Sequence, residues 1–347
     1  MTDPEPLANW HDELAAEAGK AAGEDSLQKL DLASAIAPPE VFLTLVIPAY
    51  NEETRLNGML EEAVNYLESE YGTTSSSKIP VDPQPNGTAR QRKNHSFTIP
   101  SSAAQGWEIL LINDGSTDKT LEICEQFSRN HIVPPLPRRM SGPWTHRSDQ
   151  GARIPPGSIR MVTLEENRGK GGAVTHGMRH ARGQYVVFAD ADGASKFDDL
   201  GKLVSACQEV EDGKGRGVAV GSRAHLVGSE AVVQRSKLRN FLMHSFHLLL
   251  WAITPSKTSR IKDTQCGFKL FSRQALPYIV PYMHMEGWIF DVEMLMLAEW
   301  ADIPVAEVAI GWREVIGSKL NVVWDSLGMA WGLAVLRICW GLGIYRT

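Results

Sequence analysis

The feature that most constrains the fold is an alternation of short apolar runs with helical segments. Val41–Ile47 is a continuous apolar run stopped by Pro48, which is typical of a strand covered on both faces. Residues 53–66 then carry apolar side chains three or four positions apart, as an amphipathic helix does. The alternation continues with strands predicted at 108–112, 159–164, 185–189 and 217–220, and helices at 120–128, 169–181 and 197–210. This order predicts an α/β fold on a parallel sheet.

Three further stretches lack this alternation. Residues 1–40 are rich in Ala, Glu, Asp and Pro, and we expect a mobile polar leader there. Residues 72–106 and 131–157, approximately, are crowded with polar residues and proline, and we expect two disordered insertions. The folded domain is therefore expected at 41–320, followed by an apolar and aromatic helical segment at 321–347.

Charge, cysteine content and hydropathy argue against several classes of protein. The formal net charge of -6 and the pI near 6.0 argue against nucleic-acid binding. The four cysteines stand far apart, which argues against a zinc site or a disulfide framework and favours reduced thiols facing the cytosol. The chain shows neither a secretory signal at its start nor an uncharged apolar stretch of membrane-spanning length.

The strongest chemical signal is a pair of carboxylates, Asp190 and Asp192, directly after the strand at 185–189. Ligands of parallel α/β sheets bind beyond the carboxyl ends of the strands. One carboxylate there could contact a sugar nucleotide while the other holds Mg²⁺ or Mn²⁺ against its diphosphate, since hard oxygen ligands suit these ions. Taken alone, an Asp-x-Asp pair is equally compatible with a solvated turn.

Other strand ends carry similar motifs. Pro48–Glu53 and Asn113–Asp118 follow the first two strands, and Asn167–Gly172 precedes the glycine-rich helix. Each alone could be a helix cap. Together they resemble glycosyltransferase family 2, whose members have the Rossmann-like GT-A fold. The resemblance covers residues 41–347 apart from the two insertions.

Four later segments narrow the resemblance to the branch of this family that glucosylates dolichyl phosphate. They are Gly221–Arg223, Asp263–Phe271, Phe290–Leu295 and Gly317–Lys319. The resemblance implies a metal-dependent, inverting transfer of glucose from UDP-glucose to dolichyl phosphate. The product, dolichyl β-D-glucosyl phosphate, would serve protein N-glycosylation at the endoplasmic reticulum membrane, with the catalytic domain facing the cytosol.

On the donor side, the resemblance assigns roles to strand-end residues. Asp190 would contact the ribose or the diphosphate, and Asp192 would bind the Mg²⁺ or Mn²⁺ ion. The remaining candidates for nucleotide binding are Pro48, Tyr50, Glu52 and Asp114.

On the acceptor side, the resemblance makes Arg223, Arg239 and Lys319 candidates for binding the acceptor phosphate, and places Gln265 beside the donor sugar or that phosphate. Arg223 could instead be a surface arginine, and Arg239 could cap a helix or reach a membrane surface. Because a dolichyl phosphate is already anionic, its attack hardly requires a base. Asp263 is the one carboxylate held in reserve as a base.

Two apolar segments, Phe241–Ile253 and Val322–Ile344, could be buried core helices or helices at a membrane interface. Their aromatic content and basic flanks favour the interface. The resemblance also implies an N-terminal membrane helix, whereas residues 1–40 are polar. We therefore expect either a truncated start or peripheral anchoring.

Two alternatives remain. One is a polyprenyl-phosphate mannosyltransferase that uses GDP-mannose on the same fold. The other is a catalytically silent, membrane-associated protein that binds nucleotide sugars. A dinucleotide-binding dehydrogenase is disfavoured, because no GxGxxG motif follows the first strand.

Overall fold

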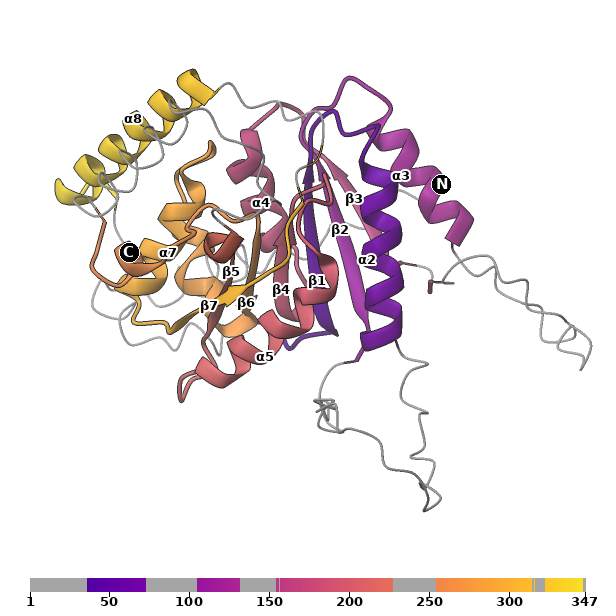
Figure 1. Cartoon of the computed structure of the whole chain (residues 1–347), viewed down its shortest axis with the longest axis horizontal. Coiled ribbons are helices and arrows are strands. Elements are labelled where there is room, and N and C mark those ends of the chain that lie inside the picture. The colour runs from indigo at the N-terminus through magenta and orange to yellow at the C-terminus, as the bar shows by residue number, and fades with distance from the viewer. Residues whose placement is uncertain are drawn as a thin grey trace, which may run out of the picture.

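The structure, a computed structural model, describes residues 36–72, 105–131, 154–155, 157–226, 254–313, 315 and 322–345. Its centre is a sheet whose strands lie in the order β3-β2-β1-β4-β6-β5-β7 (Figure 1). The strands are β1 (Val41–Ala49), β2 (Trp107–Asn113), β3 (Ile159–Thr163), β4 (Gly183–Ala189), β5 (Val218–Ser222), β6 (Phe268–Ser272) and β7 (Val305–Ala309). The α/β fold is confirmed, and the five predicted strands are all present.

Helices cover both faces of this sheet. They are α2 (Leu56–Tyr71), α3 (Thr120–His131), α4 (Gly169–Arg179), α5 (Leu200–Val210) and α7 (Phe290–Trp300), and a further helix, α8 (Val322–Gly341), lies outside α7. Side chains of β1 alternate between the two faces, so Leu45 and Ile47 pack in the core under α2, α3 and α5, while Val46 packs in the core under α4 and α7. The result is a three-layer α/β/α domain.

The prediction of a parallel sheet is correct for β1 to β4 and wrong for β6. β1 pairs in parallel with β2 and β4, whereas β6 is antiparallel to both β4 and β5. The physical reason is that the chain enters β6 from the edge of the sheet at which β4 and β5 end. There the backbone N–H of Asp190 donates to the carbonyl of Gly267, 3.2 Å away. A strand that starts at that edge has to run against its neighbours.

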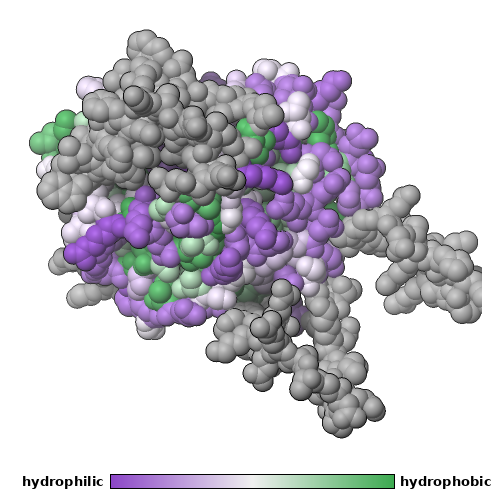
Figure 2. Space-filling model, in the orientation of Figure 1, coloured by the Kyte–Doolittle hydropathy of each residue, from purple (hydrophilic) through white to green (hydrophobic). Residues whose placement is uncertain are grey.

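The C-terminal helix α8 packs on α7. Leu333 and Leu336 are fully buried against Ile289, Val292 and Met296. Other apolar side chains of α8 face outward, Trp331 being 73% exposed and Ile338 57% exposed. Hydrophobic surface shows at the edge of the molecule where Figure 1 places this helix (Figure 2). The segment is therefore partly core and partly exposed.

Four predicted segments lie mostly or wholly outside the described residues. They are the two expected insertions, the leader expected at 1–40, of which only 36–40 are described, and the apolar segment at 241–253. Within the described part, no helix combines the length and apolarity needed to cross a bilayer.

Candidate functional site

The candidate site lies beyond the carboxyl ends of the neighbouring strands β1 and β4. These strands are neighbours in the sheet, but α2 and α3 cover one face beside them and α4 covers the other. The strand order reverses between them, because the chain runs outward from β1 through β2 to β3 and returns across the other face through α4 to β4. Ligands of α/β proteins bind in the crevice at such a point. Asp190 and Asp192 stand at this position.

Asp190 is held from two sides. Its carboxylate lies 2.5 Å from Nζ of Lys170 in the first turn of α4. On the other side, a Cβ at Gly267 would collide with this carboxylate, so only glycine leaves it room. The 190–192 motif thus has a fixed position relative to both α4 and β6.

Asp192 lies beside Asp190 in a more enclosed place. Its Oδ1 accepts a hydrogen bond from the backbone N–H of Ala194 at 2.9 Å. Burial, followed by repulsion from the Asp190 carboxylate, raises the pKa of Asp192 above its ordinary value. A cation between the two carboxylates would remove this repulsion, so the pair suits a divalent metal ion.

Lys170 is the site residue that our sequence analysis missed. Burial alone would lower its pKa, but the carboxylates of Asp190 and Asp291 outweigh burial and raise it. Its Nζ also lies 5.9 Å from the ring centres of Trp288 and Phe290. The Asn167–Gly172 motif contained this lysine, but nothing local in the sequence pairs it with a carboxylate 20 residues away.

A second lysine and carboxylate are buried behind the first pair. Lys269 on β6 and Asp291 on α7 form an ion pair and are almost fully inaccessible. Nζ of Lys269 also donates to the carbonyl of Cys266 at 2.8 Å. Burial raises the pKa of Asp291 despite Lys269 and Lys170 nearby. Two lysines thus offset part of the negative charge of three aspartates around the site.

The predicted nucleotide loops are joined to one another by hydrogen bonds. Asn51 has a left-handed backbone (φ 54°), and its Oδ1 accepts hydrogen bonds from the backbone of Thr117 at 2.8 Å and of Asp118 at 3.3 Å. Asp114 is buried, and its carboxylate accepts a hydrogen bond from the backbone N–H of Arg168 at 2.7 Å. Burial nevertheless raises the pKa of Asp114. The structure therefore brings the ends of β1, β2 and β3 into one rigid rim.

The other donor candidates lie on the same rim. Pro48 pairs with Ile112 one residue before the pairing of β1 with β2 ends, and Tyr50 beyond that end is 43% exposed. The Glu52 carboxylate is paired with Arg55, whose Nε lies 2.7 Å away. Tyr50 is accessible to a ligand, while Glu52 is already held by a neighbour.

On the opposite side of the crevice, Arg223 and Asp263 form a two-pronged ion pair. Nε and Nη2 of Arg223 lie 2.7 and 2.8 Å from the two oxygens of Asp263. Burial alone would raise the pKa of Asp263, but the hydrogen bonds from Arg223 outweigh it and hold this pKa below its ordinary value. Asp263 is thus a weak base in this arrangement, and it orients Arg223.

Gln265 connects this side of the site to the C-terminal helix. Its Nε2 lies 2.9 Å from Sδ of Met329 on α8. Because Met329 is 64 residues further along the chain, the contact is purely tertiary. The apolar helix therefore borders a candidate site residue, whereas Arg239 and Lys319 lie outside the described residues.

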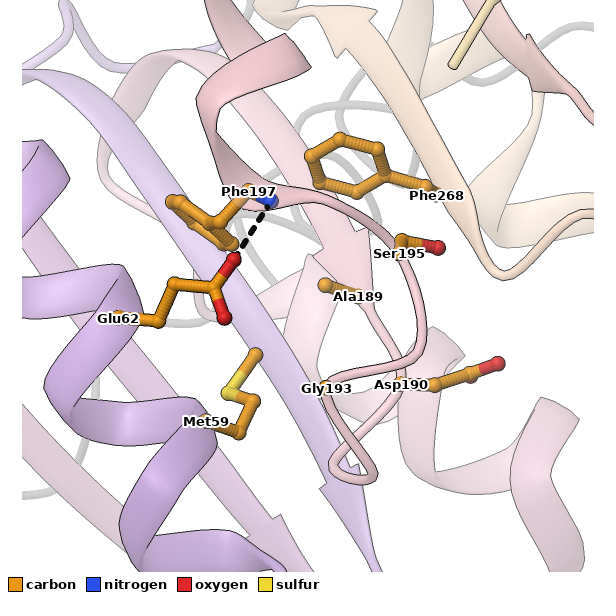
Figure 3. A pocket seen from close by; sticks show the side chains of 8 residues that line it. All are labelled: Met59, Glu62, Ala189, Asp190, Gly193, Ser195, Phe197 and Phe268. Carbon is orange, nitrogen blue, oxygen red and sulfur yellow. Dashed lines mark hydrogen bonds between the residues drawn. The ribbon is translucent and has the colours of Figure 1, made fainter. Parts of the chain in front are cut away.

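A small cavity lies beneath the 190–192 loop. Its lining consists of Met59, Glu62, Ala189, Asp190, Gly193, Ser195, Phe197 and Phe268 (Figure 3). Glu62 accepts a hydrogen bond from the backbone N–H of Phe197 at 3.0 Å and so supports the loop from α2. Figure 3 shows Asp190 pointing away from Met59 and Glu62.

Among the described residues, no group of three or more His, Cys, Asp and Glu side chains could hold a metal ion. Asp190 and Asp192 could supply two carboxylates only. A metal ion here would need its other ligands from a bound diphosphate and from water, as is usual for Mg²⁺.

Comparison with known proteins gives the site a context. The family model described as "Glycosyl transferase family 2" matches residues 96–142 and 149–277. The dolichyl-phosphate beta-glucosyltransferase of Saccharomyces cerevisiae is 40% identical over 318 residues, which cover 88% of this chain and 77% of the yeast protein. The Homo sapiens protein of that name is 35% identical over 320 residues, which cover 92% and 82%.

Solved structures agree on the fold. Glucosyl-3-phosphoglycerate synthase from Mycobacterium tuberculosis has a TM-score of 0.51 and 16% sequence identity, over 90% of this chain and 84% of the other. The same enzyme with Mn²⁺, UDP-glucose and phosphoglyceric acid has a TM-score of 0.50 and 16% identity, over 89% and 83%. At this identity the likeness concerns the GT-A fold alone.

Proposed function

Because the chain belongs to glycosyl transferase family 2, we propose that it transfers glucose from UDP-glucose to dolichyl phosphate with inversion, giving dolichyl β-D-glucosyl phosphate for protein N-glycosylation. The observation that carries this proposal is the 40% identity over 88% of the chain to a dolichyl-phosphate beta-glucosyltransferase. The site supports it with a polar donor crevice that opens beside an apolar helix.

The donor nucleotide binds along the rim formed by the ends of β1 and β2. Tyr50 is exposed there, and Asp114 is buried at the next strand end. Glu52 and Pro48 complete this rim. Asp190 at the end of β4 reaches the ribose or the diphosphate, and Lys170 beside it supplies a cation to the same group.

Asp192 is the proposed ligand of an Mg²⁺ or Mn²⁺ ion, with Asp190 beside it. When bound, such an ion supplies positive charge to the diphosphate leaving group. The raised pKa of Asp192 is consistent with a carboxylate placed to share a cation. Lys170 stands next to the same group and adds charge stabilisation of its own.

The acceptor phosphate binds on the Arg223 side. Asp263 holds the guanidinium of Arg223 from one edge, with Gln265 close by, since Nη2 of Arg223 also lies 3.4 Å from the Gln265 carbonyl. Arg239 and Lys319 are proposed as further cations for this phosphate. With its charge in place, the phosphate oxygen attacks the anomeric carbon without a base, and Asp263 acts by orienting Arg223.

The lipid part of the acceptor meets the outer face of α8. Trp331 and Ile338 on this helix and Leu342 directly after it are 57–73% exposed, and Met329 on α8 contacts Gln265. A helix with exposed apolar and aromatic side chains suits the surface of a bilayer rather than its interior. We propose that the protein acts at the endoplasmic reticulum membrane, with the catalytic domain in the cytosol and α8 at the bilayer surface.

The test is an assay of sugar transfer to a polyprenyl phosphate, with and without Mg²⁺ or Mn²⁺. UDP-glucose should be the active donor, and chelation of the metal should stop turnover. Faster transfer from GDP-mannose would identify a mannosyltransferase instead. Binding of UDP-glucose without turnover on any polyprenyl phosphate would identify a silent nucleotide-sugar binder.

A further inference from the structure

The segment from His284 to Trp288 lies between the C-terminal helix and the first turn of α4. The backbone carbonyl of Glu286 accepts hydrogen bonds from the N–H groups of Gly171 at 2.7 Å and of Gly172 at 3.3 Å. These are N–H groups of the kind that a helix start leaves without intrahelical partners. A Cβ at Gly171 would lie 2.5 Å from the Met285 carbonyl, so the approach depends on glycine. The position of α4 is therefore set by this segment.

A single carboxylate fixes the segment in turn. Oε2 of Glu293, in the first turn of α7, accepts hydrogen bonds from the backbone N–H groups of His284 at 3.0 Å and of Met285 at 2.7 Å. Its other oxygen lies 3.4 Å from Nδ1 of His284. Glu293 is fully buried, and a buried carboxylate is tolerated only where such bonds replace its water. These backbone contacts explain why a charged residue stands in this core position.

The far side of His284 contacts the end of the chain. Its ring stacks on Tyr345 at a centroid distance of 3.7 Å and an interplanar angle of 9°, and it meets Trp340 edge-on at 5.9 Å. The segment is thus held by Glu293 on one side and contacts the rings of Trp340 and Tyr345 on the other. It has little freedom to shift without moving α4.

Lys170 connects this segment to the donor site. This lysine follows Gly169 in the first turn of α4, and its Nζ contacts the Asp190 carboxylate. Glu293 itself contacts neither Asp190 nor Asp192 in any interaction that the structure records. Its influence passes through the 284–286 backbone to the start of α4.

We propose that Glu293 is a positioning residue for the donor diphosphate, acting through the 284–286 segment to place Lys170 against Asp190. The inference rests on the proposed function, because it takes the group beside Asp190 to be a nucleoside diphosphate. The placement of this segment depends on one side-chain oxygen atom of Glu293 that reaches two backbone N–H groups. It depends much less on the negative charge of that oxygen.

Two substitutions in the full chain distinguish the position of the Glu293 side-chain oxygen from its charge. Glu293→Gln keeps an oxygen at the same distance from the backbone, whereas Glu293→Asp draws it back by one methylene. Glu299→Asp is the matched control, because Glu299 lies on the same helix and accepts hydrogen bonds from the backbone of Lys257 at 2.8 Å and from that of Thr258. That segment leads to Asp263 and not to α4. The readout is the Kd of UDP in the presence of Mn²⁺, with the melting temperature of each variant.

Glu293→Asp is expected to weaken UDP binding about tenfold, as loss of a supporting hydrogen bond around a ligand site commonly does. Glu293→Gln and Glu299→Asp should bind UDP as the parent does. Unchanged UDP affinity in a folded Glu293→Asp variant would overturn the proposal, as would equal weakening in both Glu293 variants. If Glu293→Asp does not fold, the test rests on Glu293→Gln. Weakened UDP binding in that variant would contradict the proposal, because its side-chain oxygen still reaches the two backbone N–H groups. Failure of the parent itself to bind UDP would instead contradict the proposed function.

Discussion

The two sides of the crevice are built differently. On the proposed donor side, at the ends of β1, β2 and β4 and the start of α4, polar side chains form hydrogen bonds or ion pairs with one another or with the backbone, as Lys170 does with Asp190. On the proposed acceptor side, Arg223 and Asp263 form one ion pair, and beyond Gln265 the outer face of α8 carries exposed apolar side chains. The donor side is preorganised for charge. On the proposed acceptor side, the exposed apolar face of α8 is suited to bind lipid in place of water.

The largest expected effect is on the donor side. Asp192→Asn should lower the rate of glucose transfer by about 10²-fold or more, because it removes a charge from the proposed metal-binding pair. The melting temperature should change little, since an asparagine Oδ1 can still accept the hydrogen bond from Ala194. Asp198→Asn is the control, because Asp198 belongs to the same loop region and its side chain is 62% exposed. Near-parental turnover in Asp192→Asn would remove this residue from the metal site.

The next prediction concerns the outer face of α8. Replacing Trp331, Ile338 and Leu342 together with serine should weaken binding to phospholipid vesicles by up to about 10²-fold, at about 1 kcal/mol for each partly buried side chain. UDP affinity should not change, because these side chains are exposed and none of them belongs to the proposed donor residues. Flotation of vesicles with parent and variant measures the first effect, and titration with UDP the second. A parent chain that does not float would favour α8 as a helix of the soluble core.

A smaller effect is expected from Asp263→Asn. Loss of the charged partner of Arg223 should reduce kcat/KM about tenfold, mainly through the KM for the acceptor. The rate should rise with pH through about 6, where the acceptor phosphate takes its second charge. The Asp263 pKa lies below its ordinary value, so this carboxylate is already ionised throughout that range. The acidic limb should therefore persist in the variant, and its disappearance together with a loss beyond 10²-fold would make Asp263 the base.

The smallest effect is predicted for removal of residues 76–102. This stretch joins α2 to β2 and is rich in polar residues and proline. Shortening a connection between two elements changes the free energy of unfolding by about 1 kcal/mol, because loop entropy varies only with the logarithm of length. Melting temperature and UDP affinity should both stay near those of the parent. Aggregation or lost donor binding would show that the stretch contributes to the fold.

Much of the donor side could be predicted because its signals are local. A polar residue directly after an apolar run, such as Asp190 or Asn113, indicates both a strand and its carboxyl end. The sequence alone therefore predicts that these residues lie at the same edge of the sheet. The strand β6 and the helix α7 were not predicted as elements, and Lys170 was not predicted as a site residue. Lys269 explains part of this failure, because a lysine in a short apolar run does not suggest a buried strand.

The sequence by itself determined the alternating α/β architecture, the edge at which the acidic residues gather and the family to which the chain belongs. Only the tertiary structure decided the pairing of Lys170 with Asp190, of Arg223 with Asp263 40 residues away, and of Gln265 with Met329 on α8. The reason is physical. Side-chain periodicity and turn chemistry act between neighbours and can be read locally, whereas charge pairs and helix contacts depend on how distant elements dock, which no single segment specifies.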